Sequence, residues 1–198
     1  MTTKPDGITP SQTVGPYYAY CLTPSRYPLE EVFSNNLTRP GLEGDVIRIE
    51  GRVTDGDGVP VADAMLEFWQ ADGKGRFDHA LGGRGSNVGF KGFGRVEPDA
   101  EGRWSVTTIK PGRVAMKDGV LQAPYIDVAV FARGMLRNLT TRIYFADEAS
   151  TSDDPVLKLV PAERRDTLIA RKDGGVYRFD VRLQEGADGI PETVFFAC

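Results

Sequence analysis

Histidine is the scarcest functional residue in this sequence, with His79 the only one among 198 residues. Catalytic triads and zinc sites normally need histidine, so a single imidazole excludes most histidine-dependent chemistry. His79 stands in a glycine-rich segment, and without a second imidazole we expect a structural side chain there. Cysteine is nearly as rare: Cys21 and Cys198 lie near opposite ends. Both are predicted to be free thiols, because cytosolic thiols are usually kept reduced, although the sequence leaves a disulfide open.

Long apolar runs and an excess of positive charge are also missing. No stretch of about 18 apolar residues could span a bilayer, and the start, MTTKPDGITP, lacks the apolar core of a signal peptide. Lys and Arg number 24 against 28 Asp and Glu, a net charge of −4, without the dense basic stripe that phosphate backbones require. We therefore expect a cytoplasmic protein whose partners are neither a membrane nor a nucleic acid.

The residues that are present are typical of a globular β protein. Hydrophobic residues make up 40% of the chain and aromatic residues 10%, enough for a substantial core. From residue 45 onward, short alternating runs are separated by turn sequences such as DGDG at 55–58 and DAEG at 99–102. The predicted strands are 46–53, 64–70, 104–109, 126–132, 140–145, 176–183 and 193–196. This pattern predicts an all-β fold: a single β-sandwich of about seven or eight strands with little helix, apart from a short helix at 161–170.

Two segments depart from this alternation. Residues 1–43 contain prolines at positions 5, 10, 16, 24, 28 and 40, which fix the backbone torsion φ and remove hydrogen-bond donors. We predict an extended Pro-rich N-terminal arm, with one helical turn near 28–33, ahead of a sandwich domain over 44–198. The glycine-rich segment 72–94 fits either a functional loop or a plain packing loop. Its glycines lack the context of a phosphate-binding loop, and the residues alone nominate no catalytic group.

Several motifs, in sequence order, resemble those of the intradiol ring-cleavage dioxygenases, specifically the protocatechuate 3,4-dioxygenases. The segment TPSQTVGPY at 9–17 is a fairly specific signal. LEFWQAD at 66–72, IKPG at 109–112 and FARG at 131–134 follow, with further matches at 141–145, 167–170 and 192–196. FARG is similar to a motif of the family's alpha chains. The resemblance covers essentially the whole chain.

The resemblance implies Fe(III) bound by two tyrosinates and two histidines, donors suited to ferric iron, in the beta chains of this family. The residues at the four matching positions are Phe77, Val114, Tyr125 and Asp127. At most two of them have donor atoms. Gln122 stands where the iron chains have an arginine near the metal. The resemblance therefore predicts a chain that binds no metal and depends on Fe(III) held by a beta chain.

By the same resemblance, other positions are predicted to line the substrate. The arm residues that match one wall of a cleft between alpha and beta chains are Thr13, Gly15, Pro16 and Tyr17. Tyr17 resembles the tyrosine that hydrogen-bonds the iron tyrosinate released by the substrate. Arg133 matches an alpha-chain arginine near the substrate carboxylate, a task that suits a guanidinium. Without the resemblance, Arg133 would be read as a surface charge and the arm residues as a docking turn.

The implied reaction cleaves protocatechuate with O2 to 3-carboxy-cis,cis-muconate, in aromatic compound catabolism. The implied assembly is a higher oligomer of αβ protomers, in which this chain would be an alpha chain that is inactive alone. Two other interpretations are a non-catalytic transthyretin-like binding module and an autonomous intradiol enzyme that forms its own homodimer. The arm and FARG motifs argue against the module, and the missing iron ligands argue against the homodimer.

Overall fold

The computed structural model describes Thr13, Gly15, residues 21–23, Glu30, residues 33–78 and residues 90–197. Its strands are β1 (Val46–Thr54), β2 (Met65–Gln70), β3 (Phe93–Val96), β4 (Arg103–Ile109), β5 (Tyr125–Phe131), β6 (Leu139–Phe145), β7 (Ile169–Asp173), β8 (Val176–Arg178) and β9 (Val181–Arg182). The 3-10 helices η2 (Ala149–Asp153), η3 (Leu157–Leu159) and η4 (Ala162–Leu168) lie between β6 and β7. Among these residues, no helix has the length and apolar character needed to span a membrane.

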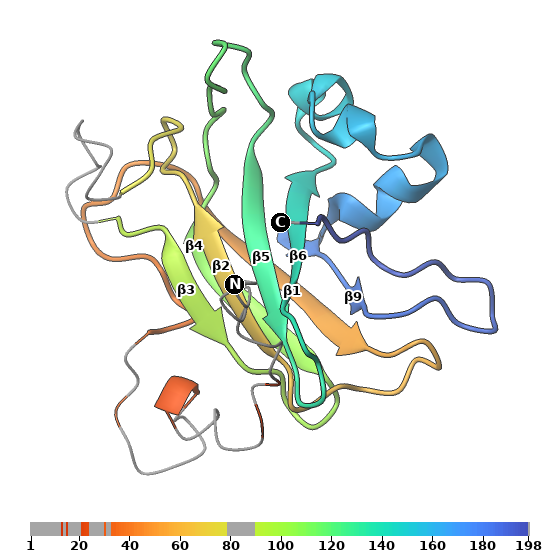
Figure 1. The fold of residues 1–198 in the computed structure, drawn as a ribbon. Helices are drawn as coiled ribbons and strands as arrows, with labels where there is room; N and C mark the ends of the chain where they lie inside the picture. The colour runs from red at the N-terminus through yellow and green to blue at the C-terminus, as the bar shows by residue number, and fades with distance from the viewer. Residues whose placement is uncertain are drawn as a thin grey trace, which may run out of the picture.

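The strands form two layers that face each other, as Figure 1 shows. The first layer has the order β3-β2-β5-β6 and the second the order β8-β1-β4, with β9 paired to β1. Strand β7 joins the layers, because it pairs in parallel with β6 and antiparallel with β8. The predicted all-β sandwich is confirmed, with nine strands in the described residues in place of seven or eight.

The main core lies between the two layers. Because successive side chains of a strand point to opposite faces, each strand sends every second residue inward. Burying one such aliphatic or aromatic side chain contributes about 1.5–3 kcal/mol. The core residues of the first layer include Leu66, Phe68, Ile126, Val128, Val130 and Ile143, and those of the second include Ile49, Val53, Trp104, Val106, Tyr177 and Val181. A smaller buried cluster, described below, lies outside this core.

The end of the arm closes the gap between the two edge strands, β3 and β4. The Arg95 N–H donates to the Ser34 carbonyl at 3.3 Å. The Thr107 N–H donates to the Asn35 carbonyl at 2.9 Å, and the Leu37 N–H donates to the Thr107 carbonyl at 2.8 Å. Open strand edges are ready to pair with other chains, and here the chain's own residues occupy part of both edges.

Two of the predicted strands differ from the observed ones. The run 176–183 is divided into β8 and β9, because the Arg52 N–H donates to Oδ1 of Asp180 at 2.8 Å. A side chain there takes the place of a backbone carbonyl and interrupts the ladder. The run 193–196 forms no extended strand; Phe196 makes an isolated bridge with Thr140.

Other predictions need smaller corrections. Strand β3 begins inside the segment 72–94 that was expected to be a loop, because Phe93 pairs with Trp69 of β2. The short helix expected at 161–170 is confirmed as η4, which gives way to β7 at Ile169. The helical turn expected near 28–33 is wrong for its described residues, Glu30 and Phe33, whereas residues 21–22 are helical.

The turn after β2 depends on the buried carboxylate of Asp72. Its Oδ1 accepts the N–H groups of Lys74 at 2.8 Å and Arg76 at 3.0 Å, and its Oδ2 accepts Nε of Arg76 at 2.8 Å. Gly75 has a φ of +76°, and a Cβ there would lie 1.9 Å from the Arg113 carbonyl oxygen. Burial opposes the charge of Asp72, but the hydrogen bonds from Arg76 and Lys74 outweigh it and lower the pKa of Asp72.

Replacing Asp72 with Asn should lower the free energy of unfolding of the purified chain by about 1–3 kcal/mol at neutral pH, because an amide cannot accept all of these bonds. The folded pKa lies below the ordinary value of 3.8, so the carboxylate stabilises the fold above that pH and loses this effect as pH falls through the folded pKa. Urea unfolding of both proteins from pH 7 to pH 3 should show the difference narrowing. A difference that stays constant would contradict the role of the charge.

Candidate functional site

The residues singled out in the sequence lie at the two ends of β5. Tyr125 begins this strand and Asp127 follows close behind, whereas Arg133 comes just after the last strand residue, Phe131. At about 3.3 Å per residue, Tyr125 and Phe131 are roughly 20 Å apart. This separation exceeds the reach of an arginine side chain. The positions that match the family's iron ligands and the arginine predicted to bind a carboxylate therefore do not meet within one chain.

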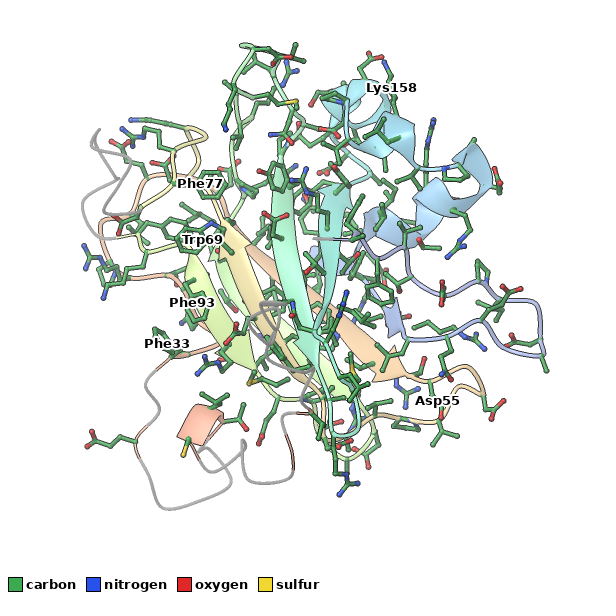
Figure 2. All side chains as sticks on the ribbon, viewed as in Figure 1. Phe33, Asp55, Trp69, Phe77, Phe93 and Lys158 are labelled. Atoms are coloured by element: carbon green, nitrogen blue, oxygen red, sulfur yellow. The ribbon has the colours of Figure 1, made fainter. Side chains whose placement is uncertain are left out.

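The four positions that match the iron ligands come together at the first end of β5. Phe77, Val114 and Tyr125 belong to one apolar cluster, in which Val114 and Tyr125 are buried. Asp127 lies on the same face of β5 as Tyr125, because the two are separated by one residue. Figure 2 shows Phe77 beside Trp69; their rings stack with centroids 5.8 Å apart and planes at 16°. Apolar side chains therefore fill much of the space around these four positions.

Arg142 of β6 ties the polar members of this cluster together. The strand register places Arg142 opposite Asp127 and Tyr144 opposite Tyr125. Nε of Arg142 donates to Oδ1 of Asp127 at 2.9 Å, and Nη1 donates to Oε1 of Gln122 at 2.9 Å. The guanidinium carbon lies 3.9 Å from the centroid of the Tyr125 ring. One cation therefore contacts a carboxylate, an amide and an aromatic ring.

The hydroxyl groups around Arg142 are held neutral. Burial raises the pKa of Tyr125, and the charge of Asp127 adds to the effect. Burial likewise raises the pKa of Tyr144, whose hydroxyl donates to Oδ1 of Asp154 at 3.0 Å. Asp127 also has a raised pKa because burial outweighs the opposing effect of Arg142. The positive charge of Arg142 acts in the opposite direction on the pKa values of both tyrosines, but burial outweighs it.

This arrangement does not fit a ferric ion. Phe77 and Val114 have no donor atom, and the phenol of Tyr125 is held neutral. The carboxylate of Asp127 is paired with Arg142, whose positive charge would repel Fe(III). In the part of the chain that the structure describes, no group of three or more His, Cys, Asp or Glu side chains could hold a metal ion. His79 lies outside that part.

The other end of β5 brings Arg133 close to the arm. The Gly134 N–H donates to Oγ1 of Thr13 at 3.1 Å, and the Gly15 N–H approaches the same oxygen at 3.5 Å. Both glycines have positive φ, +87° at Gly134 and +69° at Gly15, a conformation that favours glycine. The Arg133 side chain is 67% exposed, and its Nε lies 3.4 Å from Oδ2 of Asp63.

Two of the four predicted wall residues can thus be placed. Thr13 and Gly15 lie at the Arg133 turn, whereas Pro16 and Tyr17 fall outside the described residues. A hydroxyl has one proton and two lone pairs. Oγ1 of Thr13 accepts two N–H groups, and among the described residues no acceptor takes its own proton.

Sequence reasoning missed Arg142 and Asp63. Arg142 lies within the matched segment 141–145, but only the pairing of β5 with β6 reveals that it faces Asp127. Asp63 carries no motif, and its proximity to Arg133 follows from the register of β2 and β5. For Arg142 the useful signal is an opposite charge at a paired strand position, and for Asp63 it is an opposite charge in the turn beside the same end of the ladder. Both signals need the register to be known.

An apolar groove of about 790 Å³ adjoins the Arg133 turn. It lies between the β5–β6 connection and the C-terminal residues. Its apolar lining includes Phe131, Met135, Leu136, Leu139, Phe195 and Phe196. Leu136 is 62% exposed and lies among the other apolar residues of this groove, so together they form an exposed apolar surface.

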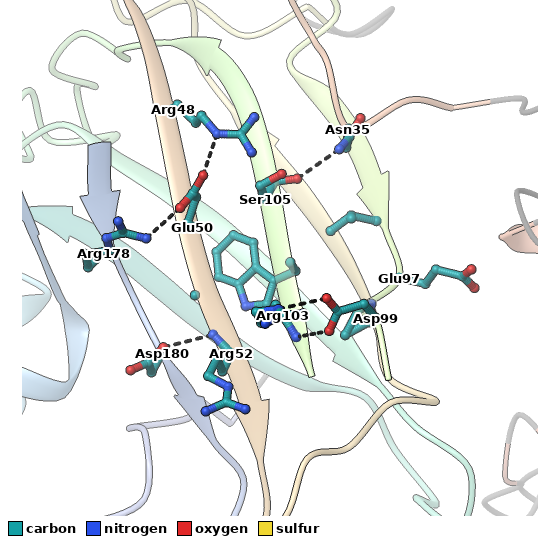
Figure 3. A pocket seen from close by; sticks show the side chains of 14 residues that line it. Asn35, Arg48, Glu50, Arg52, Glu97, Asp99, Arg103, Ser105, Arg178 and Asp180 are labelled. Atoms are coloured by element: carbon teal, nitrogen blue, oxygen red, sulfur yellow. Dashed lines mark hydrogen bonds and ion pairs between the residues drawn. The ribbon is translucent and has the colours of Figure 1, made fainter. Parts of the chain in front are cut away.

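A larger hollow, of about 880 Å³, lies on the outer face of β1 and β4 (Figure 3). Its charged side chains largely pair with one another: Arg48 contacts Glu50 at 2.6 Å and Arg103 contacts Asp99 at 2.9 Å. None of the residues predicted to bind substrate or to match the iron ligands lines it. Volume alone does not make this hollow the functional site.

Comparison with known proteins adds the family context. The family model described as "Dioxygenase" matches residues 14–185. The chain is 50% identical over 198 residues to a protocatechuate 3,4-dioxygenase alpha chain of Burkholderia cepacia, covering 95% of this chain and 96% of that one. It is 32% identical over 177 residues to a protocatechuate 3,4-dioxygenase beta chain of the same organism, covering 83% and 75%. The dioxygenase domain of a carbohydrate-binding fusion from Streptomyces sp. SirexAA-E has a similar structure, with a TM-score of 0.58, 26% identity and coverage of 91% and 100%.

Replacing Arg142 with Leu should lower the free energy of unfolding by about 2–4 kcal/mol, because it leaves Asp127 and Gln122 without their charged partner in a partly buried site. Urea unfolding of the purified chain measures this. The matched control is Arg48→Leu, which breaks the more exposed pair with Glu50 and should cost about 1 kcal/mol or less. Equal losses in the two variants would contradict a special role for the Arg142 network.

Proposed function

The chain belongs to the intradiol dioxygenase family, whose enzymes depend on Fe(III), and we propose that it is the iron-free alpha subunit of a protocatechuate 3,4-dioxygenase. In this proposal, the iron is bound by a beta chain, and the present chain completes the substrate pocket at the interface between them. The complex cleaves protocatechuate with O2 to 3-carboxy-cis,cis-muconate in aromatic compound catabolism.

The separation of the two ends of β5 carries this proposal. Arg133 lies roughly 20 Å along the strand from the positions that match the iron ligands. An arginine that serves a metal-bound substrate must therefore reach the metal site of another chain. Asp127 and its neighbours do not fit iron, so the metal site that Arg133 serves must come from a different kind of chain. A homodimer of this chain would lack it.

Arg133 is proposed to bind the carboxylate that distinguishes protocatechuate from catechol. Its guanidinium is exposed, and a carboxylate can accept two parallel N–H bonds from it. The hydroxyl proton of Thr13 is suited to donate to the same anion, because both of its lone pairs are engaged by N–H groups. Gly15, Pro16 and Tyr17 are proposed to form the adjoining wall.

This chain's part in the reaction is binding and orientation. The Fe(III) of the beta chain supplies the activation of the catecholic ring toward O2. Arg133 and Thr13 hold the carboxylate end of the substrate, so that the ring has one orientation. The arm covers the pocket from its own side and limits the access of water, which strengthens the charge pairing inside. No proton transfer is assigned to this chain.

The apolar groove beside Arg133 fits the proposed association. A relative is a beta chain that shares most of this chain's length, so two similar sandwiches are proposed to form the αβ protomer. Exposed Leu136 would be covered in such a contact, as large apolar patches on chains with partners usually are. Higher oligomers of αβ protomers in the cytoplasm are part of the proposal. A transthyretin-like binding module would not need Arg133 placed beside the arm.

Iron content provides the first test. The chain purified without a beta chain should contain well under one iron per chain, because the four ligand positions offer no suitable donor set. Co-expression with the beta chain should give a complex with iron and the colour of a ferric tyrosinate. Elemental analysis and visible absorption measure both. Stoichiometric iron in the chain alone would overturn the proposed division of labour.

The second test concerns the substrate carboxylate. In the complex with the beta chain, Arg133→Ala should lower kcat/KM for protocatechuate by roughly ten- to a hundredfold, the effect of losing a charge-assisted pair in a covered cleft. Catechol, which lacks the carboxylate, should be affected far less. Arg133→Lys should recover only part of the loss, because an ammonium lacks the planar fork.

Arg171→Ala is the matched control, since this exposed arginine also pairs with an exposed carboxylate, that of Asp166 at 3.1 Å, but lies on β7, away from the Arg133 turn. It should leave the ratio of the two substrates nearly unchanged. If Arg133→Ala reduces turnover of protocatechuate and catechol equally, Arg133 supports the fold or the interface, and its role in recognition is wrong.

A further inference from the structure

The guanidinium of Arg133 has a neighbour that no motif indicated. We propose that Asp63 is a positioning residue, which holds Arg133 in the orientation that binds the substrate carboxylate and so contributes to specificity. This inference rests on the function proposed for Arg133. It assigns to Asp63 no contact with the substrate.

The pairing of β2 with β5 places these two residues opposite each other. Met65 pairs with Phe131 at the end of the antiparallel ladder. Asp63 precedes Met65 by two residues and Arg133 follows Phe131 by two, so both lie in the turns beside this end of the ladder. Opposite charges at such positions attract each other across the strands. The observed distance of 3.4 Å between Nε of Arg133 and Oδ2 of Asp63 agrees with this arrangement.

The contact uses one edge of the guanidinium and leaves the other edge available. Arginine has five N–H groups in a rigid plane, and Asp63 lies against Nε. Within the described residues, the two Nη atoms of Arg133 have no hydrogen-bond partner. They can present two parallel N–H groups to a carboxylate. Asp63 can therefore restrain the guanidinium through Nε, while the two Nη atoms stay available for the substrate carboxylate.

The main chain of the same turn is fixed as well. The Gly134 N–H donates to Oγ1 of Thr13, which anchors the backbone next to Arg133. Asp63 adds a restraint on the side chain itself. A side chain already held in its binding orientation loses less conformational freedom when the ligand arrives. The charge of Asp63 would repel the substrate carboxylate at close range. In the proposed arrangement the guanidinium of Arg133 lies between the two carboxylates, because Asp63 contacts Nε and the substrate contacts the Nη atoms.

The ion pair has little to contribute to folding. The side chains of Asp63 and Arg133 are 41% and 67% exposed, and pairs this exposed hardly affect the stability of a free chain. Once a beta chain and substrate cover the turn, the same pair lies in a less polar environment and its attraction strengthens. The effect of Asp63 is therefore expected in substrate binding more than in unfolding.

The test uses the complex of the full chain with its beta chain and compares protocatechuate with catechol. Asp63→Asn should raise KM for protocatechuate about three- to tenfold and change kcat by less than about twofold, because binding orientation is lost and chemistry is not. Catechol kinetics should stay unchanged. In an Arg133→Ala background, Asp63→Asn should have almost no further effect, since the two residues act as one unit. Asp63→Glu, which keeps the charge, should preserve most of the discrimination.

Asp118→Asn removes the same charge from an exposed turn before β5, at the opposite end of that strand, and should leave both substrates unaffected. The inference is overturned if Asp63→Asn lowers KM for protocatechuate, alters both substrates equally, or keeps its full effect without Arg133. If Arg133→Ala is selective but Asp63→Asn is silent, the role of Asp63 alone is wrong. If Arg133→Ala is not selective, the function proposed for Arg133 fails first, and the role of Asp63 falls with it.

Discussion

The register of β5 is the constraint on which the rest of the structure depends. This strand is hydrogen-bonded on both sides, to β2 and to β6, so its alignment is fixed twice. One alignment places Asp127 opposite Arg142, and the other brings Asp63 beside Arg133. A slip of one residue on either side would turn every side chain of the moving strand to the other face and expose part of the core. Core packing thereby secures both ends of the strand, although the charged residues there, Asp127 and Arg133, do not belong to the main core.

The two ends of β5 show opposite solutions for a positive charge. At one end, Arg142 contacts a carboxylate, an amide and an aromatic ring, so its charge is paired within the chain. At the other end, Arg133 is exposed and touches Asp63 on one edge. A guanidinium that is fully paired stabilises a fold, whereas one that is partly paired is prepared for a ligand. The two arginines therefore differ in how far their charge is paired within the described residues.

The sequence was sufficient for the fold class, because alternation and turn residues directly reflect the two faces of a strand. It failed at β8 and β9, where the Asp180 side chain replaces a backbone partner, an effect that alternation does not encode. For the site, the residues that match the iron ligands gather in space, with Phe77, Val114 and Tyr125 in one apolar cluster. The partners Arg142 and Asp63 were missed because a pair of charges far apart in sequence has no meaning until the register is known.

The filled cluster at the start of β5 makes the loss of iron binding hard to reverse. A tyrosine at position 77 would place a hydroxyl in the apolar cluster, and a histidine at position 127 would leave Arg142 without its carboxylate. Each of these substitutions alone would lower the free energy of unfolding, and the chain would not yet bind a metal ion that could offset the loss. A path of single substitutions from this cluster to an iron site would therefore pass through less stable chains. Several of these positions would have to change together before the cluster could hold a metal ion.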